Sequence, residues 1–450
     1  MGSEIAALEP FVLSLSKHED SRPYIKPEFC YAPSTVILIA EVPSLTYSCL
    51  CMTTVRDDFF RFVCQTSPEP MGIEVDHAHG CVVVDKTGKE YLDFLSGIGV
   101  ASLGHAHPVV VQAVKAQAER YLHTMVYGEY IQEPQVHLAR RLAEVTPDPF
   151  SVTYFTNSGT EAIEGALKTA RKYTGRSRFV SFLDSFHGDT FGSLSVGGNS
   201  LYRTPFEPLL PTVTFLPFND LEALTQIDET VAAVIIEPIQ GEGGVRVPDP
   251  EFLPALRRRC HEVGALLIFD EVITGFGRTG KLFACEHWNV TPDILVLAKA
   301  LGGGMPLGAF ISTPEIMTIL STSPPLAHVT TFGGHPVCCA AGLASLNFMV
   351  ETNLPQRAHE KGAELLARLQ ELAGSGGFIA ARGRGLLIGM DFTTPEATKQ
   401  FVQSCFASRL ILGWTLHRDT VIRLAPPLII SSAEIDRAVT IMYQALRHNS

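Results

Sequence analysis

The chain has 450 residues, 46% hydrophobic and 18% charged, a balance that excludes a disordered or fibrous protein. Its formal net charge is −12 without any long block of Lys or Arg, so a nucleic-acid-binding face is not indicated. The apolar runs are far shorter than the ~20 residues of a membrane-spanning helix, and we expect a soluble globular chain with more than one domain.

Ten cysteines are spread along the sequence without any C-x-x-C pair, so neither a zinc ribbon nor a thioredoxin-type motif is supported. We interpret them as reduced, mostly packed thiols and expect no metal site. The first residues, Met1–Ser21, are acidic rather than basic, unlike the start of a secretory signal. Together these features predict a cytoplasmic location.

The sequence changes character near residue 55. Residues 1–55 mix prolines with a Cys-containing apolar stretch and show no sustained period of 2 or 3.6, so we interpret them as an atypical extension. From about Asp57 the pattern becomes regular. Gly80–Leu92 predicts a β-hairpin, and Pro108–Leu122 predicts an amphipathic helix that opens at a proline.

The middle of the chain alternates short apolar runs with helical patterns such as Glu161–Thr174 and Pro250–Val263. This alternation indicates βαβ units and a mainly parallel sheet, in which a ligand binds at the carboxyl ends of the strands. Beyond Leu354 a helix and a smaller α+β unit are predicted. The predicted strands of the sheet are Ser177–Phe182, Val231–Glu237, Ala265–Asp270 and Asp293–Leu297.

Two segments at strand ends contain polar residues suited to chemistry. Asn157–Glu161 opens a helix, and its backbone N–H groups and hydroxyls suit an anion, although an ordinary helix cap explains the same residues. Asp270 ends a very apolar strand, where a buried carboxylate requires a partner. A protonated ring nitrogen of a cofactor and a structural ion pair satisfy this requirement equally well.

Lys299 follows another apolar strand and precedes three glycines. Burial there is expected to lower the pKa of its amine and favour Schiff-base chemistry, the alternative being a lysine that extends to solvent. The loop Thr330–Pro336 suits a phosphate or a simple turn. An anion site, a buried acid and a strand-end lysine on one sheet match the pattern of a pyridoxal phosphate (PLP) enzyme, and no Rossmann or P-loop motif competes.

A series of motifs occurs in order over most of the chain: Leu103–Pro108, Ser158–Ala162, Phe186–Gly188, Glu237–Gly243, Asp270–Gly280, Ala298–Lys299 with the following glycines, Thr331–Gly334 and Ile422–Pro427. From about Asp57 onward the sequence thereby resembles the class III aminotransferases of fold type I, in the subgroup of the ornithine, acetylornithine and ω-amino acid enzymes. The resemblance implies a large domain with a mainly parallel seven-stranded sheet flanked by helices, and a smaller α+β domain. We expect an extension at 1–55, the small domain at 56–110 and 351–450, and the large PLP-binding domain at 111–350.

The resemblance also implies roles for single residues. Lys299 would hold PLP covalently and move the proton between Cα and C4′, while Asp270 would keep the pyridine nitrogen protonated. Arg423 would alternate between an ion pair with Glu242 and a substrate carboxylate, and the substrate site would include Ile98 and Tyr127. Thr331 would reach the phosphate of the neighbouring subunit, and the other implied cofactor contacts are Ser158, Gly159, Thr160, Phe186, His187, Glu237 and Val272. His105 and His107 are interpreted as structural.

Departures from the ornithine and acetylornithine pattern bear on the substrate. Asp189 stands where those enzymes carry an Arg for the distal carboxylate, and Ile273 replaces a Gln. Ile98 stands where ornithine-specific enzymes have a Tyr, although acetylornithine-type enzymes share an aliphatic residue there. We therefore predict an ω-transaminase, a homodimer or tetramer, that transfers an amino group from an ω-amine or primary amine to a keto acid such as pyruvate by a ping-pong mechanism.

Other activities remain open. An acetylornithine- or ornithine-type aminotransferase using 2-oxoglutarate fits if another cation, such as Arg203, replaces the missing Arg. Aminomutases and decarboxylases of the same scaffold share the Lys299 chemistry, although transamination has the larger prior. An inactive cofactor-binding scaffold would be expected to lack Lys299 or Asp270, and both are present.

Overall fold

The structure, a computed structural model, describes residues 54–127, 129–373 and 378–448 and divides the chain into two units, Met1–Pro70 and Met71–Ser450. In the first unit, helix α1 (Val55–Phe62) begins after Thr54, whose hydroxyl accepts a hydrogen bond from the Asp57 N–H at 3.1 Å. The Asp57 carboxylate accepts in turn from the Thr54 N–H at 2.9 Å. The two residues thus form a capping box that defines where α1 starts.

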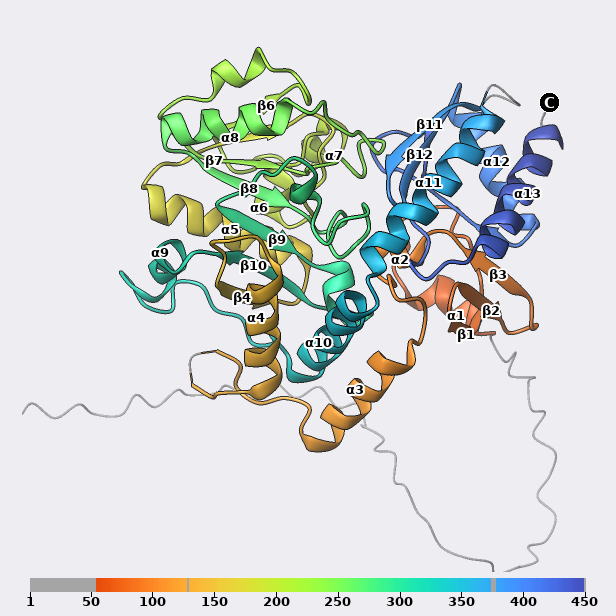
Figure 1. Cartoon of the computed structure of the whole chain (residues 1–450), viewed down its shortest axis with the longest axis horizontal. Coiled ribbons are helices and arrows are strands. Elements are labelled where there is room, and N and C mark those ends of the chain that lie inside the picture. Colours follow the sequence, from red (N-terminus) through yellow and green to blue (C-terminus); the bar gives the residue numbers. More distant parts are fainter. Residues whose placement is uncertain (1–53, 128, 374–377, 449–450) are drawn as a thin grey trace, which may run out of the picture. The chain divides into compact units, whose positions relative to one another are not determined.

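The second unit is built on a seven-stranded sheet with the order β4-β10-β9-β8-β7-β5-β6 (Figure 1). Neighbouring strands pair in parallel except β10, which is antiparallel to both β4 and β9. The mainly parallel α/β fold predicted from the sequence is therefore confirmed. The strands are β4 (Val152–Thr156), β5 (Arg178–Phe182), β6 (Val213–Leu216), β7 (Val231–Ile236), β8 (Leu266–Asp270), β9 (Ile294–Leu297) and β10 (Gly308–Ser312).

Both faces of this sheet are buried, which explains why its central strands are unbroken apolar runs. Along β9, Ile294 and Val296 belong to one buried cluster, and Leu295 and Leu297 belong to another. The first cluster includes side chains of α5 (Gly159–Thr174), and the second includes side chains of α4 (Glu133–Val145) and α8 (Phe252–Val263). Alternate residues of a strand therefore enter opposite layers, as the pleat requires.

Two four-stranded sheets accompany the large one. The first, in the order β1-β2-β3-β13, joins the predicted hairpin of β2 (Val82–Asp85) and β3 (Glu90–Asp93) to β13 (Leu410–Ile411) from far along the chain; β1 (Val75–His79) completes it. The second has the order β11-β12-β15-β14, with β11 (Phe378–Arg384), β12 (Leu387–Phe392), β15 (Val421–Leu424) and β14 (Gly413–Trp414). The domain boundaries inferred from the sequence stay predictions.

The remaining longer helices are α3 (Pro108–Arg120), α10 (Pro336–Glu351), α11 (Leu354–Leu372), α12 (Pro395–Ala407) and α13 (Ser432–His448). Short helical turns occur at α2 (Ser96–Gly99), α6 (Phe191–Ser195), α7 (Ser200–Arg203) and α9 (Pro314–Met317), and 3-10 turns at Thr204–Phe206, Ala223–Gln226, Ala284–His287, Lys299–Gly302 and Thr318–Ser321. Within the described residues, no helix alone is long and apolar enough to cross a bilayer, and α10 and α11 meet that criterion only as a pair bent by 68°.

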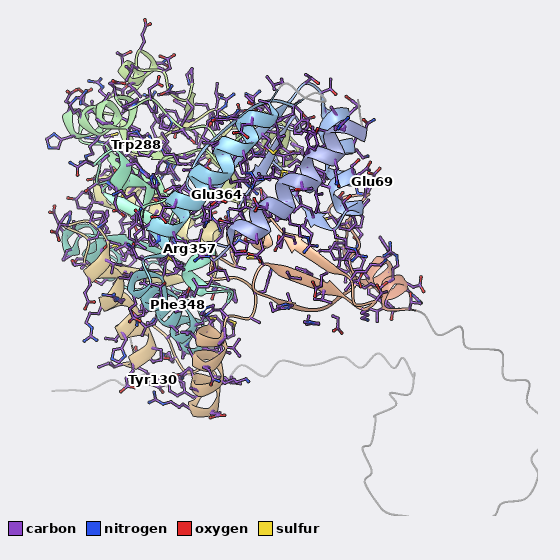
Figure 2. All side chains as sticks on the ribbon, turned by 45° about the vertical axis from the view of Figure 1, so that its right-hand side comes forward. Glu69, Tyr130, Trp288, Phe348, Arg357 and Glu364 are labelled. Carbon is purple, nitrogen blue, oxygen red and sulfur yellow. The ribbon has the colours of Figure 1, made fainter. Side chains whose placement is uncertain are left out.

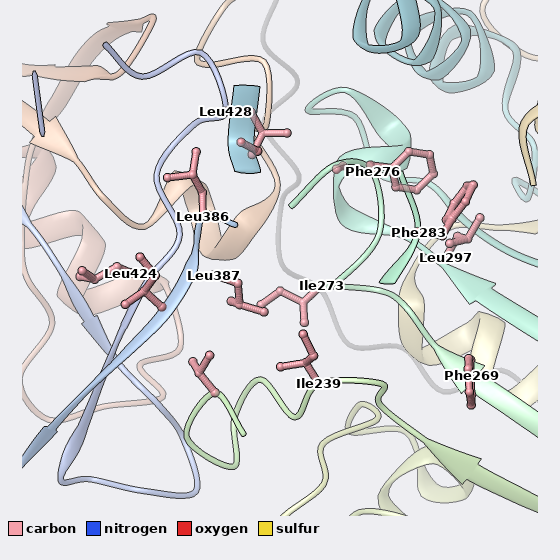
Figure 3. Close-up of a cluster of buried hydrophobic side chains, with 14 of the residues drawn as sticks. Ile239, Phe269, Ile273, Phe276, Phe283, Leu297, Leu386, Leu387, Leu424 and Leu428 are labelled. Atoms are coloured by element: carbon pink, nitrogen blue, oxygen red, sulfur yellow. The ribbon is translucent and has the colours of Figure 1, made fainter. Parts of the chain in front are cut away.

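One core connects the large sheet with the C-terminal elements. Ile273, which follows β8, lies in the same buried cluster as Leu387 of β12 (Figure 3). Arg357, labelled on α11 in Figure 2, donates to the carbonyls of Ile429 at 2.7 Å and Ile430 at 3.0 Å. These contacts hold the segment after β15 against α11.

The turn α2 is left-handed. Its residues Ser96, Gly97, Ile98 and Gly99 have φ values of 53°, 58°, 65° and 75°. For Ser96 and Ile98 this conformation costs roughly 1–2 kcal/mol each. The Asp93 carboxylate accepts the Ser96 N–H at 2.9 Å, and the Ser96 hydroxyl donates to the Ala425 carbonyl at 2.7 Å. These bonds stabilise the turn, and the chain emerges from it at Val100, which lines the cavity described next.

Candidate active site

The carboxyl ends of the parallel strands meet at one cavity of about 790 Å³. Strands β5, β7, β8 and β9 end at this edge, and the segments that follow them line the cavity. The antiparallel β10 begins at this edge, so the residues directly before it, Gly304–Leu307, line the cavity too. Residues far apart in the sequence therefore come together. Of the residues named from the sequence, the wall contains Ser158, Gly159, Thr160, Phe186, His187, Asp189, Glu237, Glu242, Asp270, Val272, Ile273, Lys299 and Arg423.

Lys299 begins the 3-10 turn that follows β9. Its backbone has φ of 49°, a conformation that costs a non-glycine residue roughly 1–3 kcal/mol. Gly303 lies at φ of 62°, and a Cβ there would approach the Ser345 Cβ to 3.0 Å, so glycine is required. Burial, reinforced by the positive charge of Arg423, lowers the pKa of Lys299 to about 8. The site thus holds an amine that loses its proton far more readily than an ordinary lysine.

Asp270, the last residue of β8, is oriented from two sides. One carboxylate oxygen lies 2.8 Å from Nδ1 of His187, and the other accepts the Val272 N–H at 3.0 Å. Asp270 and His187 are both buried, and Nε2 of His187 has no partner among the described residues. A buried carboxylate held in this way presents a fixed negative charge to the cavity.

Glu237, directly after β7, uses both carboxylate oxygens to hold the cavity wall. They accept the N–H groups of Phe186 at 3.0 Å and Gly241 at 2.8 Å. Burial raises the pKa of Glu237 to about 7, although the neighbouring His187 acts to lower it. The Phe186 contact fixes the segment that carries both Phe186 and His187.

Helix α5 begins at the cavity. The Ser158 hydroxyl accepts the Glu161 N–H at 3.3 Å and caps the helix. The N–H groups of Gly159 and Thr160 have no acceptor in the part of the chain that the structure describes. A Cβ at Gly159 would lie 3.2 Å from both methyl groups of Val272, so a larger residue would crowd the wall. Free amides at a helix N-terminus form a site for an anion.

Arg423 on β15 forms a buried ion pair with Glu242, and their side chains are only 3% and 12% exposed. The second carboxylate oxygen of Glu242 accepts the Leu416 N–H at 2.7 Å. Burial favours protonation of Glu242, but the charge and hydrogen bond of Arg423, with the Leu416 N–H, hold its pKa below the usual value. Nε of Arg423 has no partner among the described residues, so this guanidinium retains donor capacity.

Three residues named from the sequence lie outside this cavity wall. Thr331 is exposed on its own chain, and Ile98 is 47% exposed. The Tyr127 hydroxyl donates to the Phe155 carbonyl at 2.6 Å and accepts the Phe155 N–H at 2.9 Å, so Tyr127 supports β4. The roles assigned to these three residues by resemblance stay predictions.

His105 and His107 also lie away from the cavity. Nε2 of His105 is 2.8 Å from the Asp93 carboxylate, and the His107 ring packs on Phe348 with centroids 4.4 Å apart. Both contacts are structural, as expected.

Part of the apolar wall was not predicted from the sequence. Val100, Met305 and Leu307 lie there together with Ile273. Met305 and Leu307 fall between the glycines after Lys299 and the next strand, a position that points to the same sheet edge once β10 is recognised as antiparallel.

These donors fit PLP. Lys299 supplies an amine for the aldehyde, Asp270 a negative charge for the ring nitrogen, and the free amides of α5 an anion site for the phosphate. Phe186 and Val272 offer apolar surface for the ring. The parallel sheet and this set of residues together define a PLP-dependent enzyme of fold type I.

Comparison with known proteins identifies the family. A class-III aminotransferase model matches residues 63–446, and the chain belongs to this family of PLP-dependent aminotransferases. The ornithine aminotransferase of Toxoplasma gondii is 32% identical, with a TM-score of 0.81 over 87% of this chain and 94% of that one. An (S)-enantioselective ω-transaminase from Thermomicrobium roseum is 31% identical, with a TM-score of 0.81 over 88% and 98%. A PLP-bound amine transaminase from an uncultivated Pseudomonas species is 29% identical, with a TM-score of 0.80 over 86% and 98%.

Proposed function

We propose that this aminotransferase transfers an amino group from an ω-amine or apolar primary amine to a monocarboxylate keto acid such as pyruvate. One observation supports this choice of substrates. Among the described residues of the cavity wall, Arg423 is the only arginine and Lys299 is the only lysine. Because Lys299 is committed to the cofactor, the cavity offers one strong site for a carboxylate.

Asp189 and the apolar wall favour the same substrates. Asp189 lines the cavity and has no hydrogen-bond partner in the described chain, so its charge opposes a second carboxylate there. Val100, Ile273, Met305 and Leu307 offer apolar surface to the side chain of an amine.

The residues of the site divide the chemistry among them. Bound PLP supplies the electron sink for the carbon next to the transferred amine. Nζ of Lys299 would take the proton from Cα of the amine donor and deliver it to C4′ in one half of a ping-pong cycle, and would carry a proton in the opposite direction to the keto-acid carbon in the other half, which a pKa near 8 permits. Asp270, oriented by His187, keeps a negative charge facing the ring nitrogen.

Arg423 and Glu242 allow two kinds of substrate in one cavity. When a keto acid binds, Arg423 leaves Glu242 and holds the carboxylate through two N–H groups. Glu242 keeps its Leu416 contact during this exchange. When an amine without a carboxylate binds, the ion pair stays closed and neutralises the Arg423 charge.

An ornithine- or acetylornithine-type reaction with 2-oxoglutarate is the second candidate, and the position of Arg203 favours it. Arg203 lies in a small neighbouring cavity that shares Phe186, Gly188 and Asp189 with the main one, and its Nε has no partner among the described residues. That cavity has a volume of only about 10 Å³, and the Arg203 guanidinium stacks on the Phe215 ring at 4.0 Å. A distal carboxylate would reach Arg203 only after this stack opened.

Single half-reactions distinguish the two candidates. The holoenzyme is mixed with alanine, 1-phenylethylamine enantiomers, a terminal diamine, N-acetylornithine or glutamate, and the absorbance of the lysine-bound cofactor is followed. Rapid reaction with alanine and simple amines but slow reaction with glutamate supports the proposal. Rapid reaction with N-acetylornithine and glutamate, lost in R203A, contradicts it. K299A serves as the inactive control.

A homodimer is part of this proposal. Thr331 is exposed on its own chain and belongs to a motif that resembles the phosphate-binding loop supplied by a neighbouring subunit. We infer that a second copy of the chain covers this loop and that each cavity receives Thr331 from its partner.

A further inference from the structure

The segment Gly188–Ser193 approaches one face of α5 unusually closely. A Cβ at Gly188 would lie 2.5 Å from Oγ1 of Thr160, and a Cβ at Gly192 would lie 2.0 Å from a carboxylate oxygen of Glu164. Thr160 and Glu164 are four residues apart on α5 and therefore lie on the same face. The two glycines thus allow this segment to contact α5 at two successive turns.

Thr160 is the first polar contact between the two elements. Its Oγ1 lies 2.7 Å from Oγ1 of Thr190 and 2.6 Å from Oγ of Ser193, and it accepts the Thr190 N–H at 3.2 Å. A hydroxyl has one donor and two acceptor positions, so these three contacts use its full capacity. The Thr160 side chain is therefore committed to the protein, and its free backbone N–H remains for an anion.

Glu164 is the second contact. One of its carboxylate oxygens accepts the Thr190 hydroxyl at 2.6 Å, the Gly192 N–H at 2.7 Å and the Ser193 N–H at 3.2 Å. A carboxylate only accepts, so the Thr190 proton points to Glu164. Oγ of Ser193 lies closer to Thr160, at 2.6 Å, than to the Thr190 carbonyl, at 3.1 Å, so the Ser193 proton points to Thr160 and the Thr160 proton points to Oγ1 of Thr190.

We infer that Glu164 is a positioning residue for the cofactor phosphate. It holds Gly188–Ser193 against α5 and, through Thr190 and Ser193, fixes the first turn of the helix so that the N–H groups of Gly159 and Thr160 face the phosphate. Thr160 then contributes its N–H to the phosphate and its hydroxyl to the cluster. This inference goes beyond the proposed amine donor and depends only on the PLP site.

The test compares PLP with pyridoxal, which lacks the phosphate. Apoenzyme of wild type and E164A is titrated with each compound, and binding is followed by absorbance. Loss of positioning is expected to weaken PLP binding about tenfold or more, the equivalent of one charge-assisted hydrogen bond, while pyridoxal changes by less than about threefold. E164Q keeps an acceptor oxygen without the charge and is expected to fall between wild type and E164A.

A matched pair of hydroxyl deletions separates positioning from general stability. T190V removes the hydroxyl that reaches Glu164, whereas T169V removes a hydroxyl elsewhere on α5 that donates to the Gly165 carbonyl at 2.8 Å. Only T190V is expected to change the ratio of the pyridoxal and PLP dissociation constants. An unchanged ratio in both E164A and T190V overturns the inference, and if E164A does not fold, T190V alone decides. Since no amine is present, failure here is distinct from failure of the proposed substrate.

Discussion

Lys299 combines a strained backbone with a lowered amine pKa. At pH 7 an ordinary lysine is unprotonated in roughly 0.04% of molecules, and a pKa of about 8 raises this fraction to about 10%. Burial in the cavity wall and the nearby Arg423 charge therefore prepare the amine for reaction with an aldehyde. The glycines that follow allow the chain to turn there without occupying the cavity.

The first prediction concerns the pH dependence of cofactor attachment. The rate at which apoenzyme captures PLP on Lys299 should rise with pH and level off above about 8, because the unprotonated amine is the reactive form. Stopped-flow absorbance measures this rate, and K299A should show no covalent capture. A rate that continues to rise to pH 10 would contradict the lowered pKa. Because the unfolded chain binds more protons between pH 8 and 10.5, Lys299 also makes the free energy of unfolding rise with pH in that interval.

The second prediction concerns Arg423. R423Q should raise KM for pyruvate about 10- to 100-fold, since one or two charge-assisted hydrogen bonds to the carboxylate are lost. The half-reaction with 1-phenylethylamine, which has no carboxylate, should change by less than about threefold. The double variant E242Q/R423Q removes the buried unpaired charge that R423Q leaves and should show the same selectivity. Equal losses with both substrates would argue against a carboxylate role.

Lys299 and Asp270 could be predicted from the sequence because each stands at the end of an apolar run, a purely local signal. The contact between Asp270 and His187 joins positions 83 residues apart, and no local pattern specifies it. Glu164 was missed for a different reason. A Glu on an amphipathic helix has the same sequence signature whether it faces water or an opposing loop. Only the folded chain, in which Gly192 lies against the Glu164 carboxylate, shows that Glu164 faces a loop.

Among the secondary-structure elements, strands buried on both faces were the easiest to recognise. β7, β8 and β9 are continuous apolar runs, whereas β10 starts with a glycine whose Cβ would lie 2.1 Å from the Ser158 carbonyl. β13 and β14 have two residues each and owe their existence to partners elsewhere in the chain. Tertiary pairing rather than propensity decides such short strands.

The third prediction tests the packing of α11 on the turn between β11 and β12. A Cβ at Gly362 would lie 2.0 Å from the Gly385 carbonyl oxygen, a backbone atom that cannot rotate away. G362A should therefore lower the free energy of unfolding by about 1–3 kcal/mol. Urea unfolding measures the change, and Q370A, an exposed site on the same helix, should stay within about 0.5 kcal/mol of wild type. Equal stability of G362A and wild type would show that the helix can shift.

At the scale of the assembled enzyme, the proposed sharing of Thr331 has a direct consequence. T331A should bind PLP more weakly, and K299A should be inactive. In a mixed dimer, the Lys299 of a T331A chain meets the intact Thr331 of a K299A chain, so one complete cavity forms. We predict that differently tagged mixed dimers recover up to about half of the wild-type activity per dimer.

Measurement of these mixed dimers requires co-expression and purification through both tags. Activity equal to that of T331A homodimers, per intact Lys299, would show that Thr331 serves its own chain or no phosphate at all. PLP affinity measured on the same samples separates loss of cofactor from loss of assembly.

The reversed direction of β10 has a consequence for how this scaffold changes its substrates. Lys299 lies at the start of the connection between β9 and β10, directly after the end of β9. Met305 and Leu307 lie at the other end of the same connection, beyond the glycines and directly before β10, where side chains can vary while the register of the sheet is kept. Natural divergence or laboratory evolution can therefore change the accepted amine by substitutions at these two positions, while Lys299 and Asp270 stay unchanged.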